Sequence, residues 1–125
     1  MTLTADSKGR WAEERAESFL KAKGYHLLAS RYKCKQGEID LIMADLETLV
    51  AVEVKYRRQF QDGAESLSLR QKQRIQNAVC YYLSQDANLS FKYPFIRFDV
   101  VLLCQTQKPF HIINAWQLQD DFYGI

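Results

Sequence analysis

Residues 37–55, GEIDLIMADLETLVAVEVK, decide the fold of this chain. Polar and apolar residues alternate over 38–44, and residues 49–56 are rich in β-branched side chains, so both segments are predicted to be strands. The residues between them, 45–48, suit a short hairpin loop. The stretch therefore predicts an antiparallel hairpin that carries several charged side chains.

The expected register of this hairpin brings two carboxyl groups together. Pairing of residue 44 with residue 49 across the loop places Asp40 opposite Glu53. The same register places Glu38 opposite Lys55, on the same face of the sheet. Directly opposed residues have Cβ atoms roughly 4.5–5.5 Å apart, so two carboxylates there either share a cation or repel each other. A compensating metal ion or lysine is the natural explanation, and Lys55 alone could supply part of that compensation.

The spacing of Asp40 and Glu53-Val54-Lys55 resembles the active-site pattern of the PD-(D/E)XK nuclease superfamily. A wider set of motifs is similar to the YraN family of uncharacterised bacterial proteins, itself similar to archaeal Holliday junction resolvases. These motifs are Gly9, Glu13, Gly24-Tyr25, GEIDLI at 37–42, VEVKYR at 52–57 and RFDVV at 97–101. The resemblance runs from about residue 8 to about residue 101.

This resemblance implies an α/β, restriction-endonuclease-like domain with a mixed five-stranded sheet flanked by helices, in the order α-β-β-β-α-β-β. It implies a metal-dependent endonuclease that hydrolyses phosphodiester bonds of nucleic acid, with branched DNA as substrate and a homodimer as the assembly. Carboxylate oxygens suit Mg²⁺ or Mn²⁺. Asp40 and Glu53 would hold the metal together with the main-chain carbonyl of Val54. Lys55 would orient the attacking water or neutralise charge on the phosphate.

An amphipathic helix is predicted from residue 7 or 8 to Gly24, which suits the left-handed conformation after a helix. Glu13 falls on the apolar face of this helix. From periodicity alone, its carboxylate either extends to the rim of that face or takes part in a site. In the resolvase-like nucleases a glutamate of the first helix completes the metal site, and the resemblance makes Glu13 its counterpart. Ala12 precedes it, where the family usually has glycine.

The remaining segments complete the sheet. Residues 25–32 are predicted to form an edge strand, and a capping box at Ser68 and Gln71 opens a second helix. Residues 95–104 are almost continuously apolar, as in a strand covered on both faces, and residues 110–116 form a last strand. The connection from the hairpin through the helix to residues 95–104 predicts a parallel pair of strands.

Four polar side chains outside the hairpin favour structural roles. Arg97 and Asp99 interrupt the apolar strand with the same parity, which favours a structural clamp over catalysis. His26 and His111 have no histidine or cysteine partner at the spacing of metal ligands. The metal chemistry is therefore expected at the acidic hairpin and Glu13, and not at these four residues.

At 125 residues the chain is long enough for one hydrophobic core, so we expect a single domain over 1–125 with its core at about 8–116. No apolar segment is long enough to cross a bilayer, and the N-terminus has no hydrophobic signal segment. We therefore expect a cytoplasmic protein with no membrane partner. Three cysteines without a CxxC pair argue against disulfides and structural zinc.

Basic residues flank the acidic stretch, although the net charge is only +2. Lys35, Arg57, Arg58 and Lys72 are candidate phosphate contacts because they lie on both sides of the candidate metal site in the sequence. Each basic cluster taken alone is more typical of a solvated surface. Their relation to the acidic hairpin is what makes nucleic acid the expected partner.

Two alternatives to a nuclease are open at this point. One is a non-catalytic nucleic-acid-binding or interaction module on a nuclease scaffold, and the other is a purely structural hairpin. The intact Asp40, Glu53 and Lys55 argue against a decayed site, because a charged cluster without a function costs stability. A structural hairpin would leave the two carboxylates opposed without compensation.

Overall fold

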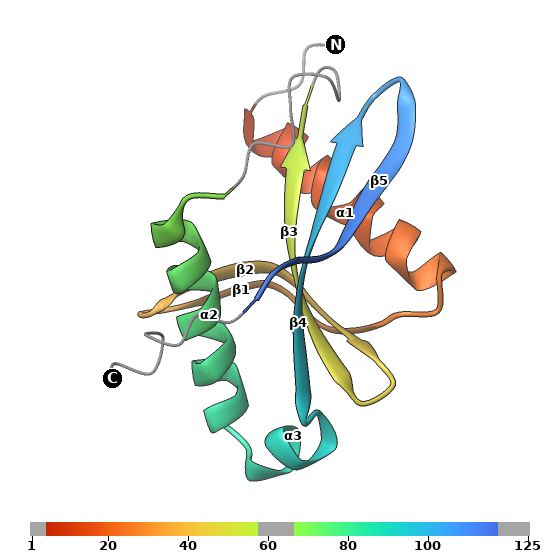
Figure 1. Ribbon diagram of the computed structural model, residues 1–125. Coiled ribbons are helices and arrows are strands. Elements are labelled where there is room, and N and C mark those ends of the chain that lie inside the picture. The colour runs from red at the N-terminus through yellow and green to blue at the C-terminus, as the bar shows by residue number, and fades with distance from the viewer. Residues whose placement is uncertain (1–4, 58–66, 118–125) are drawn as a thin grey trace.

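A computed structural model describes residues 5–57 and 67–117 of the chain. The elements are α1 Ala5–Ala22, β1 His26–Cys34, β2 Gly37–Asp45, β3 Thr48–Tyr56, α2 Leu69–Ser84, α3 Ala87–Lys92, β4 Phe95–Cys104 and β5 Gln107–Trp116. The predicted fold class is confirmed: an α/β arrangement with a mixed five-stranded sheet and helices against it (Figure 1). None of the helices within the described ranges is both long and apolar enough to cross a membrane.

The strands follow one another across the sheet in the order β1-β2-β3-β4-β5. Strands β3 and β4 are parallel, and the other neighbouring pairs are antiparallel. A parallel pair needs a crossover connection, which contains α2, as the sequence predicts. Strand β1 lies at one edge, also as predicted, and β5 lies at the other.

The helices α1 and α2 cover opposite faces of the sheet (Figure 1). Ala12, Ala16 and Leu20 of α1 pack on apolar side chains of β2, β3 and β4. On the other face, the buried apolar residues of α2 join a second cluster that also includes side chains of β2, β3 and β4. These central strands are therefore covered on both faces, which explains the long apolar runs of β3 and β4.

Strand β2 changes faces at Asp40. Ile39 belongs to the cluster under α2, whereas Leu41 belongs to the cluster under α1. Residues two apart on a regular strand share a face, so the predicted regular alternation over 38–44 is wrong at this position. The β1–β2 pairs on either side place Arg31 opposite Asp40, and Arg31 has a φ of +52°. The left-handed residue of β1 therefore lies directly opposite the point where β2 twists about its axis.

Helix α2 begins as predicted and packs tightly on β2. The Ser68 hydroxyl accepts a hydrogen bond from the Gln71 N–H at 3.1 Å, and the Gln71 side chain accepts one from the Ser68 N–H at 3.0 Å. A Cβ atom added at Gly37 would overlap the main-chain carbonyl of Arg74. The start of β2 therefore lies directly against the backbone of α2, which brings the first turns of that helix beside the acidic hairpin.

Several predicted boundaries are wrong. Helix α1 begins at Ala5 and ends before Gly24, whose φ is +98°. The hairpin loop is shorter than expected, because residues 45 and 48 still pair across it. Strand β5 begins at Gln107 instead of residue 110. The short α3 was not predicted, because a helix of six residues carries too little periodicity to be recognised.

Candidate active site

The charged cluster lies where the ladder between β2 and β3 ends. Residues 44 and 49 pair as predicted, and the ladder runs as far as Leu41–Val52. One further pair in this register would put Asp40 opposite Glu53. At this point Asp40 Oδ2 accepts a hydrogen bond from the main-chain N–H of Val54 at 2.8 Å. The Asp40 carboxylate thus accepts the hydrogen bond that a main-chain carbonyl would accept in a continued ladder. This bond fixes the position of the carboxylate between β2 and β3.

Asp40 and Glu53 are both partly buried, and each affects the pKa of the other. Burial and then the charge of Asp40 raise the pKa of Glu53 to about 8, although Lys55 acts in the opposite direction. Burial also raises the pKa of Asp40, against the opposing effect of the Val54 N–H. Two interacting carboxyl groups do not both ionise without a cation. The pair therefore retains a proton near neutral pH unless a cation binds to it.

Lys55 supplies one cation to this pair. Its Nζ lies 3.5 Å from Glu53 Oε1, and the two side chains are only 22% and 18% exposed. The sequence predicts Glu38 as the partner of Lys55, but the structure gives the lysine Glu53, two residues away on the same strand. Glu38 is exposed and lines the hollows beside Asp40 and Glu53. The ammonium group therefore contacts the carboxylate pair itself.

Glu13 joins the cluster from α1, on the inward side of the helix as predicted. Burial and the neighbouring Asp40 raise its pKa, and Arg31 lowers it. Among the described residues its Oε2 has no hydrogen bond of good geometry, although Arg31 Nε lies 3.1 Å away. Helix α1 and the hairpin thus bring Glu13, Asp40 and Glu53 into one connected group of carboxyls.

Helix α2 forms a second polar wall beside the site. Gln71 and Arg74 line a hollow together with Glu53. The two residues are three positions apart, so they lie on the same face of the helix. Lys72, the predicted phosphate contact of this helix, lies elsewhere, with its ammonium 5.9 Å from the ring centroid of Trp116. Of these two basic residues of α2, it is Arg74 that lies next to Glu53. The helical spacing from Gln71 would have been the signal that identifies it.

The other predicted phosphate contacts lie around the ends of the hairpin strands. Lys35 is exposed in the turn between β1 and β2. Arg57 follows β3, where its main-chain N–H donates to the Leu103 carbonyl at 2.8 Å and its guanidinium donates to the Tyr56 carbonyl at 2.9 Å. Arg58 lies outside the described residues. Arg57 is thus held close to the β3 backbone, whereas Lys35 extends into solvent.

Comparison with known proteins identifies the family of this chain. The sequence profile described as uncharacterised protein family UPF0102 matches residues 12–103. The chain belongs to this family. A UPF0102 protein of Nitrobacter winogradskyi is 36% identical to it, with 93% of this chain and 97% of the relative covered. A second UPF0102 protein, from Nitrosospira multiformis, is 43% identical, with 81% and 83% covered. The matched range contains all the carboxyls of the candidate site and Lys55.

The donor set of this UPF0102 chain fits a hard divalent cation. No group of three or more His, Cys, Asp or Glu side chains in the described ranges is arranged to hold a metal ion by itself. Mg²⁺ commonly binds through one or two carboxylates and keeps several of its waters. Asp40, Glu53 and the main-chain carbonyl of Val54 offer donors of this kind, and the Glu13 Oε2 without a hydrogen bond adds an acceptor nearby. The same residues offer no nitrogen or sulfur ligand for zinc.

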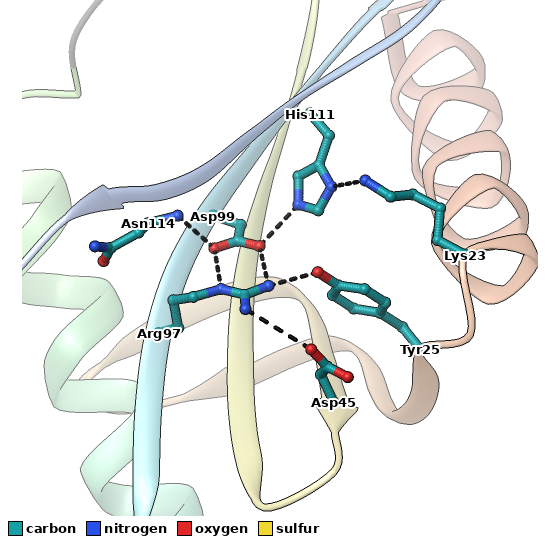
Figure 2. A network of polar contacts seen from close by, with 7 residues as sticks. All are labelled: Lys23, Tyr25, Asp45, Arg97, Asp99, His111 and Asn114. Carbon is teal, nitrogen blue, oxygen red and sulfur yellow. Dashed lines mark hydrogen bonds and ion pairs between the residues drawn. The ribbon is translucent and has the colours of Figure 1, made fainter.

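A second buried charge cluster surrounds Asp99 (Figure 2). Asp99 is fully buried and pairs with Arg97 through two hydrogen bonds, at 2.9 and 2.8 Å. Its carboxylate also lies 2.7 Å from His111 Nε2 and accepts the Asn114 N–H at 2.9 Å. Burial by itself would raise the pKa of Asp99, but these hydrogen bonds outweigh it and hold the pKa below its usual value. Arg97 and Asp99 therefore form a satisfied clamp, in agreement with the structural interpretation.

This clamp ties the end of α1 to the sheet (Figure 2). Arg97 donates to the Tyr25 hydroxyl at 2.6 Å and lies 3.9 Å from Asp45. The Lys23 ammonium lies 2.6 Å from His111 Nδ1, so Nδ1 accepts and Nε2 carries the ring proton. Lys23 and Tyr25 follow the C-terminal end of α1, whereas Glu13 lies near the middle of the helix. The clamp thus orients the helix that delivers Glu13 to the candidate site.

Proposed function

We propose that this chain is a metal-dependent endonuclease that hydrolyses phosphodiester bonds of nucleic acid. The observation that carries the proposal is the partly buried pair of Asp40 and Glu53, with Lys55 3.5 Å from Glu53 Oε1. Two interacting carboxyls at a partly buried position disfavour folding, so their arrangement is explained by a ligand that needs both. The similarity of Asp40 and Glu53-Val54-Lys55 to the PD-(D/E)XK pattern supports the same reading.

Each group has a distinct role in this proposal. Asp40, Glu53 and the Val54 carbonyl would hold Mg²⁺ or Mn²⁺, which when bound lowers the pKa of water and neutralises phosphate charge. Lys55 stabilises the negative charge that develops on the phosphate oxygens during attack, or orients the water. Glu13 supplies a further acceptor that positions water at the site. The products are a phosphate monoester and a free hydroxyl.

Branched DNA is the substrate that the resemblance to junction resolvases favours. Arg74 lines the hollow beside Glu53, and the exposed Lys35 lies in the turn that precedes β2; these are the residues along which phosphates of a bound strand would pass. The same resemblance favours a homodimer, in which two sites cut symmetric strands.

A non-catalytic nucleic-acid-binding module is the second candidate. It is favoured by the finding that no three acidic, histidine or cysteine side chains in the described ranges are arranged to hold a metal ion by themselves. In that case the basic residues around the hairpin would provide the binding, and Asp40 and Glu53 would not be needed for it. The two candidates therefore differ in what removal of the carboxylates does.

The test is cleavage of end-labelled single-stranded DNA, duplex DNA, a four-way DNA junction and RNA, with Mg²⁺ or Mn²⁺ and with EDTA. The variants are Asp40→Asn and Glu53→Gln. The matched control is Glu47→Gln, which makes the same chemical change in the exposed turn at the other end of the hairpin. Metal-dependent cutting that persists in the control and is lost in both site variants supports the nuclease. An absence of cutting, with salt-sensitive binding that survives both site substitutions, would establish the binding module instead.

A further inference from the structure

Arg31 has an unusual backbone conformation at the centre of the candidate site. Its φ of +52° lies in the left-handed region, which is unfavourable for a residue with a Cβ. The register of β1 and β2 places it opposite Asp40, at the point where β2 changes faces. Unfavourable backbone conformations of this kind persist where the surrounding structure imposes them, and they are concentrated at functional sites. This position is therefore a candidate for a role beyond the strand itself.

The Arg31 side chain lies against the carboxylates and in solvent at the same time. Its Nε is 3.1 Å from Glu13 Oε2, yet the arginine side chain is 42% exposed, compared with 18% for Glu13. Arg31 also lines two neighbouring hollows, one beside Asp40 and one along α1. A guanidinium presents its N–H donors in a planar fork, and an exposed guanidinium can contact a carboxylate and a phosphate at the same time.

A polyanionic substrate needs a cation on this side of the site. Glu13, Glu38 and Asp40 border the hollow that Arg31 lines, and their charges would repel an approaching phosphate. Lys55 contacts Glu53 on the other side of the carboxylate pair. Arg31 and Lys33 are the basic residues that line this hollow, and of the two it is Arg31 that lies against Glu13 of α1. The fork of its guanidinium matches the oxygens of a phosphodiester.

We propose that Arg31 is a substrate-positioning residue that binds a backbone phosphate of the nucleic acid beside the carboxylate pair. This inference rests on the proposed function for its substrate class. The alternative is that Arg31 serves only as the counter-ion of Glu13. The two roles differ in a double-mutant comparison. If Arg31 is only a counter-ion, its substitution has no further effect on binding once Glu13 is neutral, whereas the loss of a phosphate contact weakens binding in either background.

The informative substitution is Arg31→Asn. Asparagine tolerates the left-handed conformation better than most residues, so the variant should fold, and thermal unfolding verifies this. Arg31→Lys keeps the charge without the planar fork. Lys92→Ala is the matched control, because it removes one exposed positive charge at the end of α3, beside the start of β4 and away from the C-terminal end of β3 where Lys55 lies.

Binding of fluorescently labelled duplex DNA and of a four-way junction is measured by anisotropy in EDTA, between about 50 and 200 mM salt. We expect Arg31→Asn to bind roughly tenfold more weakly, with a salt slope lower by about one. Arg31→Lys should restore the slope, and the loss should persist when Glu13→Gln is added. An Arg31→Asn variant that binds like Lys92→Ala, or a loss that vanishes with Glu13→Gln, would overturn the inference.

The cleavage assay separates this inference from the proposed function. Cutting by the wild type with binding unaffected by Arg31→Asn leaves the nuclease in place and overturns the role of Arg31. An absence of cutting with a reduced salt slope in Arg31→Asn overturns the nuclease and supports the phosphate contact. A wild-type chain that binds none of these nucleic acids overturns both.

Discussion

The pH dependence of folding tests the buried carboxyl pair directly, through Glu53→Gln in the absence of metal. The pKa of Glu53 is about 8 in the folded chain and 4.5 in its ordinary state. Between these values the unfolded chain releases a proton that the folded chain retains. The wild type therefore loses stability as pH rises from about 4.5 to about 8. The glutamine side chain does not ionise, so the variant avoids this loss.

The size of the effect follows from the same two values. A tenfold change in proton affinity is worth about 1.4 kcal/mol, which sets a ceiling of about 5 kcal/mol for the pair. Water entry and side-chain relaxation reduce such penalties, so we expect about 2–3 kcal/mol. At pH 8.5 with EDTA, Glu53→Gln should then be more stable than the wild type by this amount. Near pH 4.5 the two proteins should differ little.

Urea unfolding from pH 5 to pH 9 gives the free energy of unfolding of the wild type and of Glu53→Gln at each pH. The contributions of titrating groups that the two proteins share cancel in the difference between the two curves. Glu47→Gln, in the exposed turn, should run parallel to the wild type. Added Mg²⁺ should flatten the wild-type curve more than that of Glu53→Gln, because a cation favours the ionised pair. Parallel curves for the wild type and Glu53→Gln across this range would refute the shared proton.

Two further predictions concern the frame of the site. Gly37→Ala should destabilise the fold by about 1–3 kcal/mol in urea unfolding, because the added Cβ overlaps a carbonyl of α2. Gly9→Ala, with open space around it in α1, should be neutral or stabilising by up to about 1 kcal/mol. Asp99→Asn should cost about 3–5 kcal/mol in the same assay, since it leaves Arg97 without its anion. Because the pKa of Asp99 is depressed, its contribution is present above the ordinary carboxyl pKa and is lost as pH falls. Stability measured from pH 6 down to pH 3 should therefore fall more steeply in the wild type than in Asp99→Asn.

The hairpin could be predicted because its register depends on local patterns. Alternation over 38–44, β-branched residues over 49–56 and a short polar loop are enough to pair residue 44 with residue 49. The opposition of Asp40 and Glu53 then follows by counting. The parallel crossover was predictable for a similar reason, since a capped helix separates two apolar strands.

The role of Arg31 could not be predicted in this way. A left-handed φ has a sequence signal at glycine or asparagine, but none at arginine. The change of faces in β2 depends on how α1 and α2 pack on the two sides of the sheet, which alternation along one strand does not encode. The preference of the site for Arg74 over Lys72 likewise depends on the rotation of α2 about its axis.

The two buried acidic clusters of this chain have opposite electrostatic character. Asp99 receives hydrogen bonds from Arg97, His111 and a main-chain N–H, and its pKa is lowered. Asp40 and Glu53 lie in the same sheet, and the pKa of each is raised by burial. The fold can therefore satisfy a buried carboxylate where the role is structural. The incomplete compensation at Asp40 and Glu53 is then a property of that site, and the cation that we propose to bind there would complete it.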